Sequence, residues 1–229
     1  MILTIDTSTR NAGVALARDG QVVAARSWWS AVNHTAELMP AVAHLLEGER
    51  LSAKDLDGIA VALGPGGFSA LRVGMSVAKG LAMASGRPLA GISTLDAEAQ
   101  PYLQSGLSVC ALLDAGRTEV SSGYFGANGQ RLREDRICPP AELLDEVGAP
   151  LLFCGEGTSA HAEFIRDRMG DQVLVVGHSP AARLWALTAL AHDRLEAGES
   201  DDAATLQPYY LRMPSIGGPK RRDRVRQGA

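Results

Sequence analysis

The sequence predicts an α/β protein made of two domains, each built on a mixed sheet of parallel and antiparallel strands. Three observations support this prediction. Each half opens with an apolar strand that ends on an aspartate, Asp6 in the first half and Asp114 in the second. Each half then passes through tight turns into antiparallel strands, and each goes on with alternating helices and strands. The duplication rests on the order of the elements rather than on sequence identity.

The boundary between the domains is predicted at Gln104-Ser105-Gly106. Residues 1–104 then form the N-terminal domain and residues 105–218 the C-terminal domain, whose last helix could pack back on the first domain. Residues 219–229 are a basic tail that we expect to be disordered.

The first half reads as three strands followed by alternating helices and strands. Short apolar or alternating runs predict strands at residues 1–6, 13–18, 21–27, 58–63 and 89–92. Apolar residues at helical spacing predict helices at 34–47 and 69–85. Asp19-Gly20 supplies the positive φ of a hairpin turn. Gly86 ends the second helix, and Ser93 or Thr94 caps a third.

The second half repeats this order. Strands are predicted at residues 109–113, 120–125, 131–137, 151–154 and 173–176. Asn128-Gly129 is the hairpin turn within this half. Helices are predicted at residues 141–147, 160–169 and 181–197.

Composition places the chain among globular proteins of the cytoplasm. Apolar residues make up 46% and charged residues 21% of its 229 residues, which suits packed cores. No apolar stretch approaches the roughly 20 residues of a membrane-spanning helix, and residues 1–6 lack the basic start of a signal peptide. Cys110, Cys138 and Cys154 are odd in number and far apart, so we expect free thiols.

Net charge is −4 and is unevenly distributed. The tail from Pro219 holds five basic residues and one acidic residue, so the rest of the chain is more acidic than the total indicates. A basic tail could contact the phosphates of RNA, or it could simply be a solvated terminus.

Asp6-Thr7-Ser8-Thr9 is the first segment that could carry chemistry. A carboxylate at a strand end can hold hydrated Mg²⁺, and the hydroxyls and backbone N–H groups after it can bind phosphate. The same residues could instead satisfy local backbone groups in a turn. The sequence leaves both readings open.

A glycine-rich loop, G-P-G-G-F-S-A-L-R-V-G at residues 64–74, is the most distinctive stretch. Such a loop between a strand and a helix can bind an anion through backbone donors, or its glycines can permit tight packing. It lacks the Gly-Lys-Ser/Thr of a phosphate-binding P-loop and the glycine that a nucleophile elbow needs after its serine.

The helix that follows this loop carries small residues four apart, Gly74, Ala78 and Ala82, flanked by Gly80 and Ala84. Glycine inside a helix costs about 1 kcal/mol relative to alanine, so close approach of another element is expected. That element is either the helix's own sheet or a helix of another chain, in which case the helix at 34–47 is a second contributor.

The chain resembles the TsaB family, formerly called YeaZ. The matching segments run in order along nearly the whole chain: I-D-T-S-T at 5–9, N-H-T-A-E-L-M-P at 33–40, the glycine-rich loop at 64–74, G-I-S-T-L-D at 91–96, L-L-D-A-G-R-T-E-V at 112–120 and P-Y-Y-L-R at 208–212. The family usually has Ser-Phe-Thr-Gly in its loop, where this chain has Gly67-Phe68-Ser69-Ala70. The resemblance implies the actin-like ATPase (ASKHA, ribonuclease H-like) fold.

The resemblance also implies a function. The chain would be a non-catalytic partner of TsaD in forming threonylcarbamoyladenosine next to the anticodon of tRNAs that read codons beginning with A. TsaE, an ATPase, would join through the complex, and the free chain could form a homodimer. Docking would use the two helices named above, with these residues: His34, Leu38, Val42, Leu45, Leu71, Gly74, Met75, Ala78 and Ala82.

Catalysis by this chain is not expected. The metal site of TsaD-like catalysis needs an H-x-x-x-H pair, and no two of the five histidines are four residues apart. The nucleotide cleft looks vestigial, and these residues would line it: Asp6, Thr7, Ser8, Asp114 and Gly155. We expect no catalytic residue, metal ligand or tightly bound cofactor, with ATP and Mg²⁺ expected, if at all, at an interface of the complex. The alternatives are an actin-like ATPase or kinase and, less favoured, a glycoprotease-type peptidase.

Overall fold

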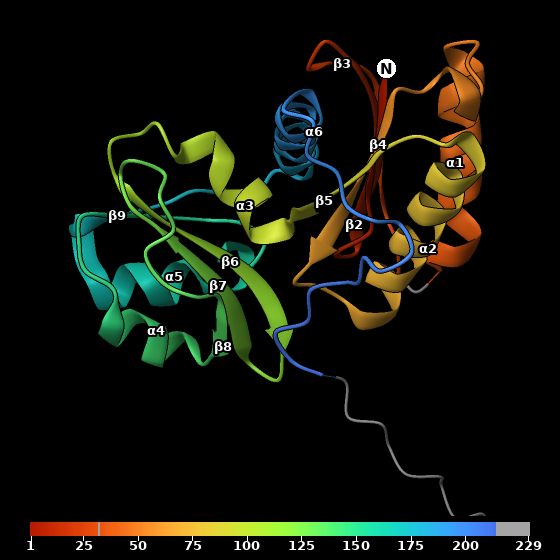
Figure 1. Cartoon of the computed structure of the whole chain (residues 1–229). Coiled ribbons are helices and arrows are strands. Elements are labelled where there is room, and N and C mark those ends of the chain that lie inside the picture. Colours follow the sequence, from red (N-terminus) through yellow and green to blue (C-terminus); the bar gives the residue numbers. More distant parts are fainter. Residues whose placement is uncertain (32, 214–229) are drawn as a thin grey trace, which may run out of the picture.

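Two five-stranded mixed sheets stand side by side in the computed structural model, which describes residues 1–31 and 33–213 (Figure 1). The first sheet has the order β3-β2-β1-β4-β5. Its strands are β1 (Ile2–Asp6), β2 (Asn11–Arg18), β3 (Gln21–Trp29), β4 (Gly58–Gly64) and β5 (Leu89–Ser93). The second sheet has the order β10-β9-β6-β7-β8. Its strands are β6 (Ser108–Gly116), β7 (Glu119–Phe125), β8 (Arg136–Cys138), β9 (Leu151–Cys154) and β10 (Val173–Val175).

The two sheets have the same topology. In each, the first strand pairs antiparallel with the second and parallel with the fourth. β1 therefore corresponds to β6, and the strands on either side of each correspond in the same way. The predicted fold class of two α/β domains with mixed sheets is confirmed. The order of elements that repeats in the sequence corresponds to a sheet topology that repeats in the structure.

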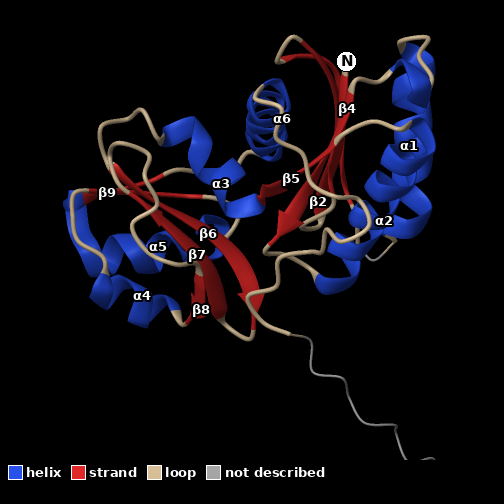
Figure 2. Cartoon of the chain, in the orientation of Figure 1, coloured by secondary structure: helices blue, strands red, loops and turns tan. Residues whose placement is uncertain are grey.

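Helices cover the sheets in layers (Figure 2). They are α1 (His34–Gly48), α2 (Phe68–Ser85), α3 (Thr94–Ala99), α4 (Pro140–Glu146), α5 (Thr158–Met169) and α6 (Pro180–Glu196), with short 3₁₀ turns at Ala53–Asp55, Gln100–Tyr102 and Gly170–Gln172. α1 and α2 cover one face of the first sheet, while α6 packs on all five strands of that sheet and on α3, between the two sheets. The last helix of the second half thus packs on the first sheet.

Local sequence signals account for most element ends. Asp19 and Gly20 both have positive φ in the β2–β3 turn, and Gly86 closes α2 in the left-handed conformation. The Ser93 side chain accepts the Asp96 backbone N–H at 3.3 Å and caps α3. The strand predicted at 131–137 is shorter, since Arg131 makes only an isolated bridge with Phe125 and regular pairing begins at β8.

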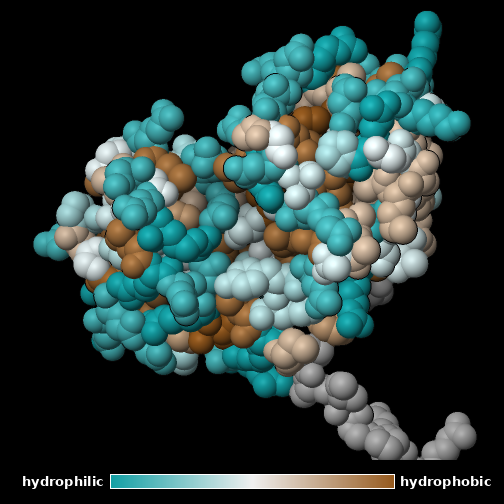
Figure 3. Space-filling view, viewed as in Figure 1, coloured by the Kyte–Doolittle hydropathy of each residue, from teal (hydrophilic) through white to brown (hydrophobic). Residues whose placement is uncertain are grey.

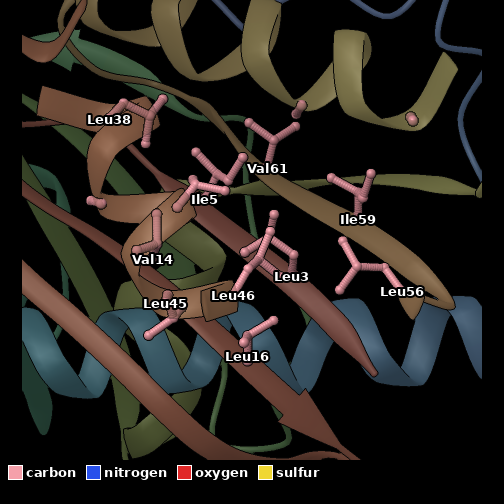
Figure 4. Packing of buried hydrophobic residues seen from close by; sticks show 14 of the residues in the cluster. Leu3, Ile5, Val14, Leu16, Leu38, Leu45, Leu46, Leu56, Ile59 and Val61 are labelled. Carbon is pink, nitrogen blue, oxygen red and sulfur yellow. The ribbon is translucent and has the colours of Figure 1, made fainter. Parts of the chain in front are cut away.

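The main core lies between the first sheet and helices α1 and α2 (Figure 4). Leu3 and Ile5 of β1 and Val61 of β4 meet Leu38 and Leu45 of α1 there, all of them buried. Apolar packing therefore fixes α1 and α2 on the sheet and leaves their opposite faces exposed.

The three cysteines are buried free thiols, and burial raises the pKa of Cys110 to about 12.

The segment after α6 runs from the first sheet to the second (Figure 1). The Asp201 backbone N–H donates to Leu89 O at 2.7 Å, and the Tyr209 N–H donates to Leu63 O at 2.8 Å. Arg212 then reaches Glu119 of β7 at 2.6 Å. The tail predicted at 219–229 lies outside the described residues. Nowhere between residues 1 and 213, as described, is a helix long and apolar enough to cross a membrane.

Candidate functional site

A buried arginine, Arg183, holds the junction between the two sheets together. It lies on α6 with Leu187 and Ala191, four residues apart, on the helix face that packs inward. Its Nε donates to Asp6 Oδ2 at 2.8 Å. Its Nη1 donates to Glu98 Oε1 at 2.9 Å and to Glu156 Oε2 at 3.0 Å.

The remaining nitrogen of Arg183 binds the turn after β1. Nη2 donates to the Thr9 hydroxyl at 3.0 Å and to the Asn11 carbonyl at 2.6 Å. The side chain has no exposed surface. Every nitrogen of the guanidinium therefore has a partner, as a buried charge requires.

Three carboxylates face this one guanidinium. Burial disfavours the charge on Arg183, but Asp6, Glu98 and Glu156 outweigh burial and hold its pKa above the ordinary value. Burial by itself would raise the pKa of Glu156, yet the Thr9 hydroxyl and the Arg183 charge lower it overall. The Thr9 hydroxyl and Arg183 together thus favour the ionised form of Glu156.

The Asp6-Thr7-Ser8 turn is buried and locally satisfied. Asp6 Oδ1 accepts both the Ser8 backbone N–H at 2.9 Å and the Ser8 hydroxyl at 2.6 Å, while Oδ2 is held by Arg183. The Thr7 hydroxyl donates to Ala70 O at 2.7 Å. Of the two readings of this segment, the geometry favours the structural one, because both Asp6 oxygens are already engaged.

Close packing explains Gly64 and Gly66 of the loop at residues 64–74. A Cβ on Gly66 would overlap the Ser8 carbonyl, and one on Gly64 would come within 2.6 Å of Tyr209 O. The Gly67 N–H donates to Ser8 O at 2.8 Å. The small size of Gly64 and Gly66 and the N–H of Gly67 therefore serve contacts with neighbouring parts of the chain.

The corresponding turn of the second half is open. Asp114 is exposed, and its Oδ1 accepts the Gly116 N–H at 2.7 Å. Gly155, with φ of +91°, lies against the Leu112 backbone, where a Cβ would overlap the carbonyl. Gly155 thus serves close packing, as the loop glycines of the first half do.

Two of the hollows between the two domains have volumes of about 500 and 680 Å³. Of the five residues predicted for a vestigial nucleotide cleft, Ser8 and Asp114 line the larger hollow, together with Glu156 and His34. Asp6 and Thr7 lie buried behind it, and Gly155 packs on Leu112. The structure brings these residues to one region but leaves only two of the five on the surface of the cleft.

The predicted docking residues require a correction. Apart from His34, all of them are buried in the chain itself: Leu38, Val42, Leu45, Leu71, Gly74, Met75, Ala78 and Ala82. The reason is that the apolar and small faces of both helices pack on their own sheet. A Cβ on Gly74 would overlap the Thr7 hydroxyl, so this glycine serves contact within the chain.

His34 differs from the other predicted docking residues. It is partly buried at the start of α1 and lines the larger hollow. Burial lowers its pKa, opposed by the nearby charges of Glu37 and Asp6. Glu37, one turn further along α1, accepts the Trp28 indole N–H at 3.0 Å and so fastens α1 to β3.

The outward faces of α1 and α2 carry a different set of small and apolar residues. We call this set the α1–α2 face, and it comprises Ala36, Met39, Ala43, Ser76, Gly80, Met83 and Ala84, all exposed. Met39 and Met83 are 44% and 69% exposed. Figure 3 shows pale brown atoms gathered along this side of the molecule. A Cβ on Gly80 would meet nothing within 4 Å, so packing within the chain does not explain this glycine.

Sequence reasoning missed Arg183 and Glu98 as members of the junction, and it missed His178, whose Nδ1 lies 3.4 Å from Glu98 Oε1. One signal was available for Arg183: it occupies a position of the inward stripe of α6, where an isolated charge must find a buried partner. Glu98 and Asp6 are brought to it from 85 and 177 residues away. No local spacing reveals contacts of that separation.

The comparisons of this chain with known proteins agree on one family. The tRNA N6-adenosine threonylcarbamoyltransferase family, TsaD, matches residues 29–214. The tRNA threonylcarbamoyladenosine biosynthesis protein TsaB of Bacillus subtilis (strain 168) is 31% identical, over 93% of this chain and 94% of that protein. YeaZ from Pseudomonas aeruginosa aligns with a TM-score of 0.75 at 27% identity, over 92% of this chain and 99% of that one.

A more distant structure shares the fold alone. The activator of 2-hydroxyisocaproyl-CoA dehydratase from Clostridium difficile, with bound ADPNP, aligns with a TM-score of 0.54 at 10% identity, over 86% of this chain and 95% of that one. Together with the repeated sheet topology, this likeness confirms the predicted actin-like fold.

Proposed function

Because the chain belongs to the TsaD family and is similar over nearly its whole length to a protein named TsaB, we propose that it is the non-catalytic partner subunit of a TsaD protein. Its role lies in the threonylcarbamoyladenosine modification of tRNA, as the names of its relatives indicate. The complex would modify the adenosine next to the anticodon of tRNAs that read codons beginning with A. TsaE would join through that complex.

The observation that carries the non-catalytic role is the Arg183 junction. An actin-like enzyme needs a free carboxylate at the end of its first strand to hold hydrated Mg²⁺ near the phosphates. Here both oxygens of Asp6 are engaged, one by Ser8 and one by Arg183. A buried guanidinium beside that carboxylate also repels a cation.

For the docking surface we propose the α1–α2 face in place of the buried residues. The exposed Ser76, Gly80 and Ala84 lie four apart on α2, so another helix can approach closely along them. The exposed Met39 and Met83 offer apolar area at the same face. In the free chain the same face would support a homodimer.

Co-elution with the cognate TsaD on size exclusion tests this proposal, followed by a modification assay with and without this chain. We expect a stable complex and higher modification in its presence. Gly80→Arg should abolish co-elution while the thermal denaturation midpoint of the free chain stays near that of wild type.

Gly148→Arg is the matched control for the docking test. Gly148 lies after α4, and a Cβ there also meets nothing within 4 Å. This variant should co-elute like wild type. If Gly80→Arg co-elutes as well, the docking surface lies elsewhere.

An actin-like ATPase or kinase is the second candidate, because the hollow of about 680 Å³ includes Ser8 and Asp114. Calorimetry of the isolated chain with ATP and Mg²⁺ separates the two functions. The partner-subunit function predicts no binding heat. A saturable heat with turnover of ATP would favour the enzyme.

A further inference from the structure

Three exposed arginines lie around the hollows of about 500 and 680 Å³ between the two domains. Arg10 lines the larger hollow and Arg117 lines the smaller one. The Arg72 guanidinium lies 4.2 Å from the ring centre of Phe68, a residue that lines both hollows. Among the described residues, none of these three guanidinium groups has an acidic partner or donates a hydrogen bond. Their positive charges are therefore free to attract an anionic ligand.

Acidic side chains at the hollows do not cancel these charges. Of the described residues that line either hollow, only Asp114 and Glu156 are acidic. Glu156 is already paired with Arg183 at 3.0 Å, so Asp114 alone opposes the three arginines. Arg212 also lines the smaller hollow, but it is paired with Glu119 and adds nothing to this balance. The rim of the cleft is therefore positive, although the net charge of the whole chain is −4.

Aromatic rings alternate with these charges along the same surface. Trp29 lines the larger hollow, is 61% exposed and lies 6.0 Å from the Arg10 guanidinium. At the smaller hollow, the ring of Tyr210 lies 4.9 Å from that of Phe68, and Tyr209 is 39% exposed. Exposed aromatic faces are unfavourable in water, so a flat apolar partner that covers them is favoured.

Single-stranded nucleic acid is the ligand that presents phosphates and stackable bases together. A double helix keeps its bases stacked inside, and an acidic peptide would pair with the arginines but leave the rings uncovered. A mononucleotide has one base, whereas exposed rings lie at both hollows. That the nucleic acid is RNA rests on the proposed function.

We propose that this chain itself binds single-stranded RNA along the rim of the cleft. Arg10, Arg72 and Arg117 bind phosphates, while bases stack on Trp29 and Tyr209. In the complex, this surface would hold unpaired nucleotides of the tRNA, such as those of the anticodon loop.

The basic tail begins close to this surface. The last described residue, Met213, lines the smaller hollow. Lys220, the first of the five basic residues of the tail, follows after at most about 25 Å of extended chain. The tail would therefore add phosphate contacts next to those of the three arginines.

Fluorescence anisotropy of the full-length chain with a labelled RNA hairpin at low salt tests the surface. We expect the hairpin, whose loop is unpaired, to bind more tightly than an RNA duplex of equal length. Trp29→Ala should weaken hairpin binding about fivefold or more, through the loss of one stacked base. Trp185→Ala is the matched control, because Trp185 is 53% exposed but lies on α6 and lines neither hollow. It should bind as wild type does.

Arg117→Gln and Arg50→Gln form a second matched pair. Both arginines are exposed, with φ of +57° and +56°, but Arg50 follows α1 and lines neither hollow. Arg117→Gln should weaken binding and reduce the slope of log binding constant against log salt by about 0.7, the value for one phosphate contact with a single strand. Arg50→Gln should change neither.

Three results would overturn the proposal: no RNA binding by wild type at low salt, equal binding of hairpin and duplex, or equal losses in Trp29→Ala and Trp185→Ala. Displacement of the hairpin by excess ATP with Mg²⁺ would also overturn it and would assign the hollows to a mononucleotide.

Co-elution with TsaD separates this inference from the proposed function. Trp29→Ala should co-elute with TsaD as wild type does. A wild-type chain that co-elutes but does not bind RNA would contradict only this inference. A wild-type chain that binds the hairpin but does not co-elute would contradict only the partner role.

Discussion

The ends of β1 and β6 occupy equivalent places in two sheets of the same topology, yet their aspartates have opposite surroundings. Asp6 is 1% exposed and is held by Ser8 and Arg183. Asp114 is exposed and accepts a hydrogen bond from its own turn, at the Gly116 N–H. The end of β1 is therefore buried, whereas the end of β6 faces the cleft.

The difference arises from a single helix. α6 follows the last strand of the second sheet but packs on the first sheet, so it delivers Arg183 to β1 and leaves the end of β6 uncovered. A strand that ends in aspartate is therefore compatible with both a buried structural carboxylate and a free one. The partner supplied by a distant element decides between them.

Among the substitutions that test this comparison, removal of Arg183 should lower the stability of the chain most. Arg183→Met leaves three carboxylates near one another without their counter-ion, and we expect it to lower the free energy of unfolding by about 3–5 kcal/mol. Urea denaturation measures the change. Arg168→Met is the control, because Arg168 pairs with Asp145 on the surface, and it should cost less than about 1 kcal/mol. Equal losses in the two variants would contradict the role given to the junction.

The two aspartates can be compared directly by the same substitution. Asp6→Asn weakens a hydrogen bond from a buried guanidinium, which is expected to cost about 1.5–3 kcal/mol of stability. Asp114→Asn changes an exposed side chain and should stay within about 0.5 kcal/mol of wild type. Thermal denaturation of both variants measures this difference, and an equal loss of stability at both positions would contradict it.

Two glycines of α2 test how closely this helix packs against the turn after β1. A Cβ on Gly74 would overlap the Thr7 hydroxyl, so Gly74→Ala should destabilise the chain by about 1–3 kcal/mol despite its better helix propensity. Gly80→Ala meets open space and should stabilise the chain by up to about 1 kcal/mol. Chemical denaturation should therefore give changes of opposite sign for the same substitution in one helix.

A further effect, which depends on pH, concerns a second arginine, Arg131, which binds Asp96 and Asp135. Burial raises the pKa of Asp135 to about 6, in spite of the Arg131 charge. Because the folded state then holds this proton more tightly than the unfolded state, stability should fall as pH rises from about 4 to about 6.

The variant Asp135→Asn lacks this titration. The difference in free energy of unfolding, variant minus wild type, should therefore increase with pH over that range, by less than about 1.4 kcal/mol per pH unit, the limit for one proton. Urea denaturation at several pH values measures it. A difference that stays constant would show that Asp135 titrates alike in both states.

Most of the fold was predictable because its signals are local. The apolar run at 151–154 matches β9 residue for residue, and Asp19-Gly20 forms the predicted turn. The strand predicted at 131–137 was too long, because regular pairing with β7 begins only at Arg136. The Arg131 side chain instead binds Asp96, 35 residues away. That contact depends on how α3 packs against the second sheet, which no window of sequence reveals.

The sequence by itself determined the order of the elements, the turns, the repeated strand-and-aspartate pattern and the family. These depend on residues close together in the chain, where periodicity and turn chemistry act directly. Only the tertiary structure decided that Gly74 faces Thr7 while Gly80 faces outward, and that Asp6 is sealed while Asp114 is open. Those outcomes depend on which distant surface each side chain meets, and α6 brings that surface from the far end of the chain.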